Sequence, residues 1–111
     1  MRSRMFLATL VALISALAPA MVASPAEAAS LRTWKRLAQC ESGLRWHINT
    51  GNGYYGGLQF SSSTWQGFGG RKFAPNAHRA TRSEQIKIAE KVRRAQGWGA
   101  WPACSEKIGL R

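Results

Sequence analysis

The chain has 111 residues, 45% of them hydrophobic, and its 16 Lys and Arg residues outweigh five acidic residues to give a formal net charge of +11. This length allows one small domain and excludes a multidomain architecture. The two cysteines and two histidines show no spacing typical of metal ligands, so we expect neither a metal nor a cofactor.

Residues 1–28 predict a secretory signal peptide. Two arginines precede an apolar stretch over residues 5–22, and an Ala-Glu-Ala triplet then gives a small-x-small cleavage site near Ala28 and Ala29. A membrane anchor is the alternative, but a serine and a proline interrupt the apolar stretch. We therefore expect a secreted or cell-wall protein with no stable membrane anchor.

The remaining domain, residues 29–111, is strongly basic. Removing residues 1–28 takes away two arginines and one glutamate, which leaves a formal charge of +10. Basic chains usually indicate a nucleic-acid partner, but export argues against one, and acidic polymers of a cell envelope fit both the charge and the compartment. The alternative is that the charge only keeps the protein soluble.

Two cysteines, Cys40 and Cys104, are the candidates for a covalent link in this small domain. In an exported chain an even pair predicts a disulfide, and the loop that it closes would stabilise the fold by about 4 kcal/mol. Two free thiols, or a catalytic pair, are the alternatives.

The first predicted helix runs from Leu31 to about Ser42, with Ser30 as its N-cap and Gly43 as its stop. Residues spaced three and four apart form one stripe on this helix, which consists of Leu31, Trp34, Leu37, Ala38 and Glu41.

Glu41 is the last member of that otherwise apolar stripe. Burial disfavours the charged form of a carboxyl, and the C-terminal end of a helix does so too, so both raise its pKa and suit it to act as a general acid. The alternative is a buried structural glutamate paired with an arginine.

Residues 46–60 form a glycine-rich segment with aromatic and amide side chains, and its Asn52-Gly53 pair is typical of a type I′ hairpin turn. Aromatic faces and amide groups are what a sugar-binding groove uses. The same composition also fits turn chemistry combined with core aromatics.

A short helix is predicted over residues 64–68, capped by one of the serines at 61–63 and ended by two glycines, with Trp65 and Phe68 mostly in the core. Residues 71–82 predict a solvated loop, with His78 at its surface.

The sequence Thr81-Arg82-Ser83-Glu84 is a capping box, and the helix that it begins is predicted to reach about Gln96 and to stop at Gly97. Its predicted apolar face consists of Ile86, Ile88, Ala89, Val92 and Ala95. Glu90 is expected to face solvent or a basic neighbour. Two more tryptophans precede Cys104, so the disulfide would hold this segment next to the helix of Glu41.

Three blocks of sequence carry a family resemblance. They are Trp34-x-x-Leu37-Ala38-x-Cys40-Glu41-Ser42-Gly43, Ile48-Asn49-Thr50-Gly51-Asn52-Gly53-Tyr54-Tyr55-Gly56-Gly57-Leu58-Gln59-Phe60, and Gln96-Gly97-Trp98-Gly99-Ala100-Trp101-Pro102-x-Cys104. With these blocks the chain resembles the resuscitation-promoting factors of actinobacteria, whose catalytic domain is lysozyme-like and lytic-transglycosylase-like. The resemblance covers essentially all of residues 29–111.

The resemblance implies an α+β, mainly helical fold: a small, monomeric lysozyme-like domain with a short β-hairpin along one wall of a cleft and a disulfide between the two cysteines. It also implies cleavage of the β-1,4 bond between N-acetylmuramic acid and N-acetylglucosamine in peptidoglycan, with a role in wall remodelling and the resuscitation of dormant cells. The implied site residues are Glu41 as the catalytic acid, Gln59, Thr64 and Gln96 along the cleft, and Tyr54 and Trp65 shaping or supporting it.

The chain departs from the family pattern at Ser61, where some relatives have an aspartate. A second catalytic carboxylate would have to be Glu84, Glu90 or Glu106, and none lies in a cleft-like segment. The simpler hypothesis is that Glu41 works alone, assisted by the acetamido group of the substrate, and yields either a 1,6-anhydro or a hydrolysed sugar.

Two rival functions remain at the level of sequence. The first is a non-catalytic, cationic protein that binds wall glycans or signals, and the second is a membrane-active protein, although no long amphipathic helix supports it. Other wall hydrolases are partners of some relatives, and no further domain in the sequence indicates one here.

Overall fold

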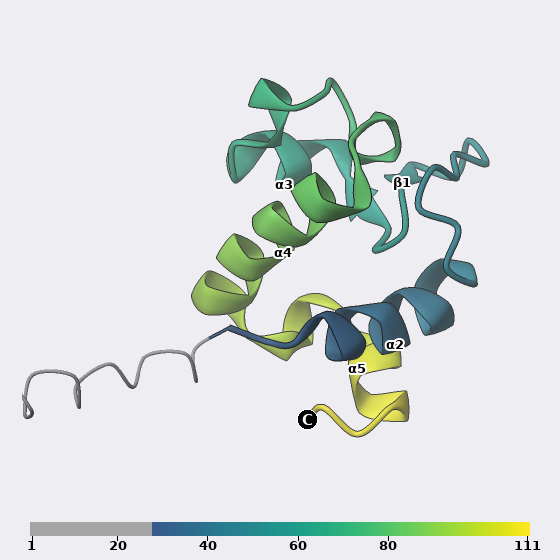
Figure 1. The fold of residues 1–111 in the computed structure, drawn as a ribbon, viewed down its shortest axis with the longest axis vertical. Coiled ribbons are helices and arrows are strands. Elements are labelled where there is room, and N and C mark those ends of the chain that lie inside the picture. Colours follow the sequence, from purple (N-terminus) through teal and green to yellow (C-terminus); the bar gives the residue numbers. More distant parts are fainter. Residues whose placement is uncertain (1–27) are drawn as a thin grey trace, which may run out of the picture.

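The computed structural model describes residues 28–111, and the predicted signal peptide lies outside the described residues except for Ala28. Four α-helices dominate this described part of the chain: α2 (Leu31–Ser42), α3 (Ser62–Gly67), α4 (Arg82–Gln96) and α5 (Pro102–Lys107). A two-stranded sheet, β1 (Tyr54–Tyr55) and β2 (Phe60–Ser61), and three short 3₁₀ turns, η3 (Gly70–Lys72), η4 (Ala77–Arg79) and η5 (Trp98–Ala100), complete it. The α+β, mainly helical fold is confirmed (Figure 1).

Helix α2 has the predicted ends. The Ser30 hydroxyl accepts a hydrogen bond from the Thr33 amide at 3.1 Å, and Gly43 adopts the left-handed conformation with φ of 67°. Trp34, Leu37 and Ala38 are fully buried. Leu31 is 48% exposed, so the buried part of the predicted stripe begins at Trp34.

Helix α4 also begins and ends as predicted. The Thr81 hydroxyl accepts a hydrogen bond from the Glu84 amide at 3.1 Å. The Glu84 carboxylate accepts one from the Thr81 amide at 2.9 Å, which completes the capping box. Its buried face is turned relative to the prediction and consists of Gln85, Ile88, Ala89 and Val92. Ile86 is half-buried and Ala95 is exposed.

The hairpin is present, but its turn is not the predicted one. Tyr54 pairs with Ser61 and Tyr55 with Phe60, so the connection runs through residues 56–59. The Asn52-Gly53 pair precedes β1 and lies in a separate chain reversal, which the antiparallel bridge between Asn49 and Tyr55 closes. There the Asn52 side chain accepts a hydrogen bond from the Tyr54 amide at 3.0 Å and forms a local Asx turn.

Helix α3 starts at Ser62, two residues earlier than predicted, with Ser61 as its N-cap. The following segment is less solvated than predicted, since its alanines Ala74, Ala77 and Ala80 are buried in the core. His78 is half-buried rather than at the surface, and its ring stacks on Tyr55 at a centroid distance of 5.2 Å.

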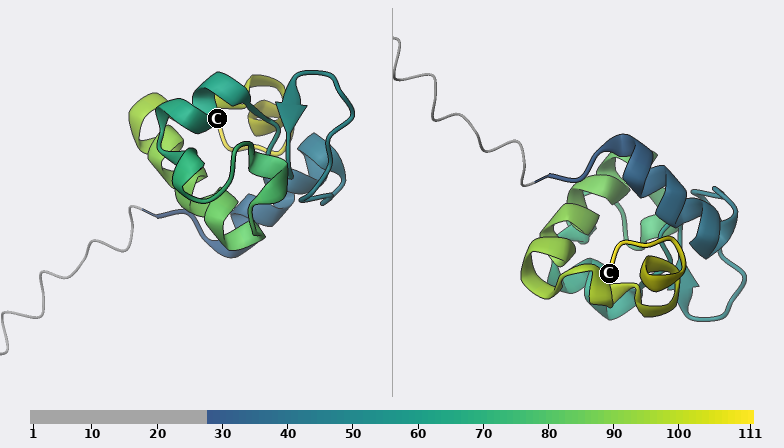
Figure 2. Two further views of the ribbon diagram at one scale, coloured as in Figure 1. Left: turned by 90° about the horizontal axis from the view of Figure 1, so that it is seen from above. Right: turned by 90° about the horizontal axis from the view of Figure 1, so that it is seen from below.

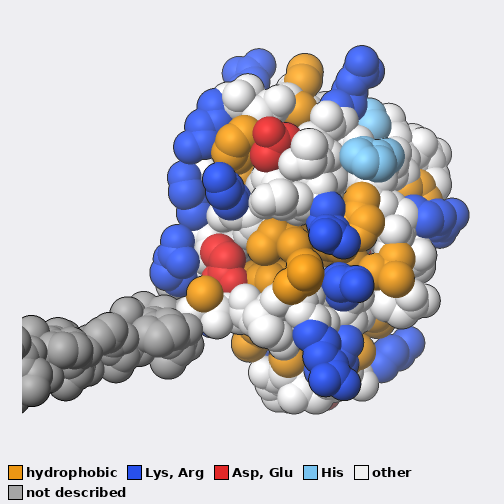
Figure 3. Space-filling model, viewed as in Figure 1, with side chains coloured by type: hydrophobic (Ala, Val, Ile, Leu, Met, Phe, Trp, Pro, Cys, Tyr) orange, Lys and Arg blue, Asp and Glu red, His pale blue; other side chains and the backbone are white. Residues whose placement is uncertain are grey.

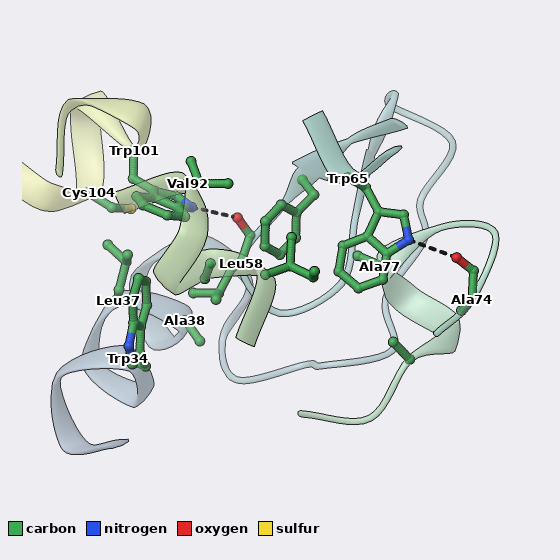
Figure 4. Packing of buried hydrophobic residues seen from close by; sticks show 14 residues of the cluster. Trp34, Leu37, Ala38, Leu58, Trp65, Ala74, Ala77, Val92, Trp101 and Cys104 are labelled. Atoms are coloured by element: carbon green, nitrogen blue, oxygen red, sulfur yellow. Dashed lines mark hydrogen bonds between the residues drawn. The ribbon is translucent and has the colours of Figure 1, made fainter. Parts of the chain in front are cut away.

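The core lies between α2, α4 and the hairpin connection. Figure 4 shows Trp34, Leu37 and Ala38 of α2 near Trp101 and Cys104, with Leu58 and Val92 between this group and Trp65. The predicted Cys40–Cys104 disulfide is confirmed and joins α2 to α5. The views in Figure 2 agree that α2 and α5 lie next to each other.

Within residues 28–111, no helix is both long and apolar enough to span a membrane. The same residues contain no group of three or more His, Cys, Asp or Glu side chains placed to hold a metal ion.

Candidate active site

A groove crosses the surface between the hairpin and the segment that leads into α5. It consists of two adjoining hollows of about 300 and 90 Å³ that share Tyr54, Gln59, Ala100 and Trp101 as walls. The wider hollow is also lined by Glu41, Pro102 and Ala103, and the narrower one by Phe60, Ser61, Thr64, Val92 and Gln96. The structure thus brings Glu41, Gln59, Tyr54, Thr64 and Gln96 into one groove.

Glu41 lies in the last turn of α2, where both of its neighbours are held in place. Cys40 is tied to α5 by the disulfide, and the buried Ser42 hydroxyl donates to the Gly57 carbonyl at 2.9 Å. These two links fix the end of α2 against α5 on one side and the hairpin connection on the other. The backbone that carries the carboxyl is therefore preorganised.

Burial raises the pKa of the Glu41 carboxyl above its ordinary value of 4.5. Within residues 28–111, no hydrogen bond or ion pair holds this carboxyl in its charged form. The alternative of a structural glutamate paired with an arginine therefore does not describe Glu41. A half-buried, unpaired carboxyl in a groove is suited to donate a proton to a bound substrate.

The glutamate that is paired with an arginine in a structural role is Glu90. Its side chain is 12% exposed, accepts a hydrogen bond from the Trp34 indole at 2.7 Å and forms an ion pair with Arg93 at 3.1 Å. The prediction of a basic neighbour is confirmed. Glu84 is held in the capping box, so among the described carboxylates only Glu41 lines the groove.

The hairpin wall is fixed from behind by Gln85, which the sequence-based argument missed. This fully buried side chain accepts from the Gly57 amide at 3.0 Å and donates to the carbonyls of Trp46 and Ala80 at 2.8 and 3.1 Å. Gly57 is required here because a Cβ atom would lie 2.3 Å from the Trp46 ring. The available signal was that Gln85 is spaced three, four and seven residues before Ile88, Ala89 and Val92, which places an amide on the apolar face of the helix.

Trp101 is a second residue whose role was missed. It is 5% exposed, lines both hollows, and donates its indole hydrogen bond to the Leu58 carbonyl at 3.0 Å. Its ring packs edge-on against Trp34 at 5.4 Å. A rigid aromatic wall of this kind offers an apolar face to a sugar ring. The sequence feature that could have indicated this role is the position of Trp101 between a glycine-containing segment and Cys104.

The narrow end of the groove is shaped by the start of α3. The Ser61 hydroxyl accepts from the Thr64 amide at 3.1 Å and lies 3.0 Å from the Thr64 hydroxyl, so it acts as the helix N-cap. Aspartate is an equally good N-cap, which gives this position a structural role whichever of the two residues occupies it.

Trp65 does not line the groove. It is fully buried, donates to the Ala74 carbonyl at 2.8 Å and packs against Phe60 at 5.3 Å (Figure 4). Direct contact between Trp65 and a glycan is therefore excluded in this structure, and any contribution it makes is support of the wall through Phe60.

The surface of the domain is basic, although no Lys or Arg side chain lines the groove itself. Figure 3 shows one face of the molecule, on which Lys and Arg side chains lie along the outline and between exposed hydrophobic side chains. In the described part of the chain, the only ion pairs join Arg93 and Arg94 to Glu90. The positive charge is therefore largely uncompensated within the molecule, which favours attraction of an anionic partner.

Comparison with known proteins decides the family. The model of the transglycosylase-like domain matches residues 28–104. Resuscitation-promoting factor Rpf1 of Corynebacterium glutamicum is 59% identical over 93 residues, which are 84% of this chain and 48% of that protein. The chain belongs to the resuscitation-promoting factor family.

Other resuscitation-promoting factors match to a similar degree. Resuscitation-promoting factor Rpf of Micrococcus luteus is 51% identical over 111 residues, covering 98% of this chain and 48% of the relative. Resuscitation-promoting factor RpfB of Mycolicibacterium smegmatis is 60% identical over 79 residues, covering 71% and 22%. The chain spans about half the length of the first two relatives.

Proposed function

We propose that this resuscitation-promoting factor is an exported peptidoglycan-cleaving enzyme that breaks the β-1,4 bond between N-acetylmuramic acid and N-acetylglucosamine. The observation that carries the proposal is the position of Glu41. It is half-buried, has a raised pKa and lines a groove whose other walls are aromatic and amide side chains. Membership of a transglycosylase-like family supports the same chemistry.

In the proposed reaction Glu41 protonates the glycosidic oxygen, and the acetamido group of the muramic acid unit stabilises the anomeric carbon. The resulting carboxylate then takes a proton back from the sugar's 6-hydroxyl, which gives a 1,6-anhydro end, or from water, which gives a hydrolysed end. Tyr54, Gln59, Thr64 and Gln96 bind the strand along the groove. The proposal also includes wall remodelling that promotes the growth of dormant cells.

The Glu41→Gln variant tests the assignment. The amide keeps the size of the side chain but cannot donate a proton, so release of muropeptides from purified sacculi should fall by at least about 10²-fold. Mass spectrometry of the wild-type products distinguishes anhydro from hydrolysed ends. The matched control is Gln39→Glu on the exposed face of α2, which should leave turnover unchanged. Wild-type turnover by a folded Glu41→Gln protein would overturn the assignment.

The basic surface supports a second candidate, a non-catalytic protein that docks on acidic wall polymers. In that case, binding to sacculi would be the same for wild type and Glu41→Gln, would decline steeply with added salt, and would release no fragments. The enzyme proposal expects salt to weaken binding to intact walls but not to abolish cleavage of soluble glycan fragments.

A further inference from the structure

Glu90 is a largely buried carboxylate that the proposed reaction does not use, and it contacts Ala29, near the start of the described residues. Its Oε2 atom accepts the backbone N–H of Ala29 at 2.8 Å as well as the Trp34 indole at 2.7 Å. Its Oε1 atom accepts from the Arg93 guanidinium at 3.1 and 3.2 Å. Both oxygens are thus bound, and one of them faces the nitrogen of the residue that follows the predicted cleavage site.

The Ala28–Ala29 bond lies at the edge of the folded domain. Ala28 is exposed, whereas Ala29 is half-buried and packs on the hydrophobic core. In Figures 1 and 2 the chain before α2 passes the C-terminal half of α4, which carries Glu90. A cut after Ala28 would therefore free a nitrogen that is already seated against a carboxylate.

We propose that cleavage of the Ala28–Ala29 bond creates a half-buried ion pair between the α-ammonium group of Ala29 and Glu90. An exported-protein peptidase hydrolyses the peptide bond: water supplies a hydroxyl to the Ala28 carbonyl and a proton to the Ala29 nitrogen, and the amine takes a further proton from solvent. The neutral N–H donor to Glu90 then becomes a charged donor, and a charge-assisted hydrogen bond is the stronger of the two.

The new positive charge lies close to the N-terminus of α2, where Glu90 is needed to compensate it. The nitrogen of Ala29 lies just before α2, whose first turn contains no acidic residue and does contain Arg32. A cation at a helix N-terminus is unfavourable, so without Glu90 the freed ammonium group would destabilise the helix. With Glu90 it completes a cluster that holds the Trp34 indole, and Trp34 packs on Trp101 in the groove wall at 5.4 Å.

The proposal rests on export in the proposed function, and its test separates the two. Mass spectrometry of the protein exported from its full-length gene should give a chain that starts at Ala29. If the protein is absent from both the medium and the wall, export itself is contradicted. If the exported protein begins at a residue other than Ala29, the proposed cleavage site is wrong but export is not.

The ion pair is tested on synthetic residues 29–111, which contain every residue of the described hydrophobic core. One form has a free amine at Ala29, and the other has an acetylated amine, which keeps an N–H donor but carries no charge. The free form should melt about 4–8 °C higher. Equal melting temperatures, or a more stable acetylated form, would overturn the proposal.

Two variants show whether Glu90 is responsible. In Glu90→Gln the advantage of the free amine should disappear or reverse, whereas in Glu84→Gln, on the same helix but in the capping box, it should remain. If Glu90→Gln does not fold, the ¹⁵N-labelled Ala29 amine of the wild-type protein gives the answer, because a paired ammonium exchanges its protons slowly and shows a through-space contact with the Trp34 indole proton. An amine signal without that contact would contradict the pair.

Discussion

At the scale of single residues, the structure gives two glutamates opposite roles through their surroundings. Glu41 has no partner that stabilises its charge, and burial raises its pKa. Glu90 is bound by Trp34, Arg93 and the Ala29 amide. A carboxyl without partners can exchange a proton with a substrate, whereas one saturated with donors serves the fold.

The raised pKa of Glu41 predicts a pH dependence of activity. The general acid must be protonated, so kcat/KM should decline as the pH rises through the pKa of Glu41, and this decline should lie above pH 4.5, the ordinary value. Initial rates on soluble glycan fragments between pH 4 and 9 measure it. A decline centred at or below 4.5 would contradict the role of burial.

The same shift has a consequence for stability. Because the folded state holds the proton of Glu41 more tightly than the unfolded state, the stability due to this group is present at acid pH and is lost as the pH rises through the folded pKa. At pH 7 the free energy of unfolding of Glu41→Gln should therefore equal or exceed that of the wild type. The difference should be less than about 1 kcal/mol, because the carboxyl is only half-buried. Thermal unfolding at pH 4 and pH 7 provides the comparison.

Ser61 gives a separate test of one-carboxylate catalysis. Ser61→Ala should lower the free energy of unfolding by about 1 kcal/mol through loss of the α3 cap, whereas Ser61→Asp should keep it. If Glu41 works alone, Ser61→Asp should also leave turnover within about threefold of wild type. The exposed Ser63→Ala is the control. A tenfold or larger gain for Ser61→Asp would show that a second carboxylate takes part.

At the scale of elements, the groove depends on how the hairpin is joined to α4. Gln85 is the link, because its side chain bonds the Gly57 amide and the carbonyls of Trp46 and Ala80. The connection between β1 and β2 that carries Gln59 therefore rests on one buried side chain of a helix 26 residues further along the chain. Strands of two residues each cannot provide that rigidity themselves.

Replacement of Gln85 should thus damage both stability and the site. Gln85→Ala leaves buried backbone groups without partners and a cavity, so the free energy of unfolding should fall by about 2–4 kcal/mol in urea titrations. At temperatures where the variant is still folded, KM for glycan should rise. Gln66→Ala, on the exposed side of α3, should change stability by less than about 0.5 kcal/mol. Similar effects of the two substitutions would contradict this role.

At the scale of the whole molecule, the disulfide connects the helix that carries Glu41 to one wall of the groove. It joins α2, which carries Glu41, to α5, whose first residues Pro102 and Ala103 line the same hollow. The cysteines are separated by 64 residues, so the link also restricts most of the unfolded domain. The disulfide therefore stabilises the folded domain and also holds Glu41 in position relative to Pro102 and Ala103.

The double variant Cys40→Ser with Cys104→Ser should lose about 4 kcal/mol of stability, the value expected for a loop of this length. For a domain with a small core this loss is most of the total, so activity at 37 °C should also fall. Urea unfolding of the variant, and of the wild type with and without reductant, measures the effect. Unchanged unfolding after complete reduction would contradict it.

The sequence by itself determined the features encoded within a few residues, which are the ends of α2 and α4 and the capping box. The even number of cysteines and the family resemblance predicted the disulfide, and the helical stripe together with that resemblance predicted the candidate acid Glu41. Caps and stops depend on hydrogen bonds between residues three or four apart, which a pattern reveals directly. The family resemblance also named five of the residues that line the groove, Glu41, Tyr54, Gln59, Thr64 and Gln96, and the structure buries Trp65 in the core, where the sequence placed most of its side chain.

Only the tertiary structure decided which groups from distant segments meet. It showed that the hairpin turns at residues 56–59, that Gln85 and Trp101 hold the groove walls, and that Glu90 rather than Glu41 is the paired structural acid. Trp34 and Glu90 are 56 residues apart, and Trp101 and Leu58 are 43 apart. Such contacts follow from how the whole core packs, and neither periodicity nor local hydrogen bonding contains that information.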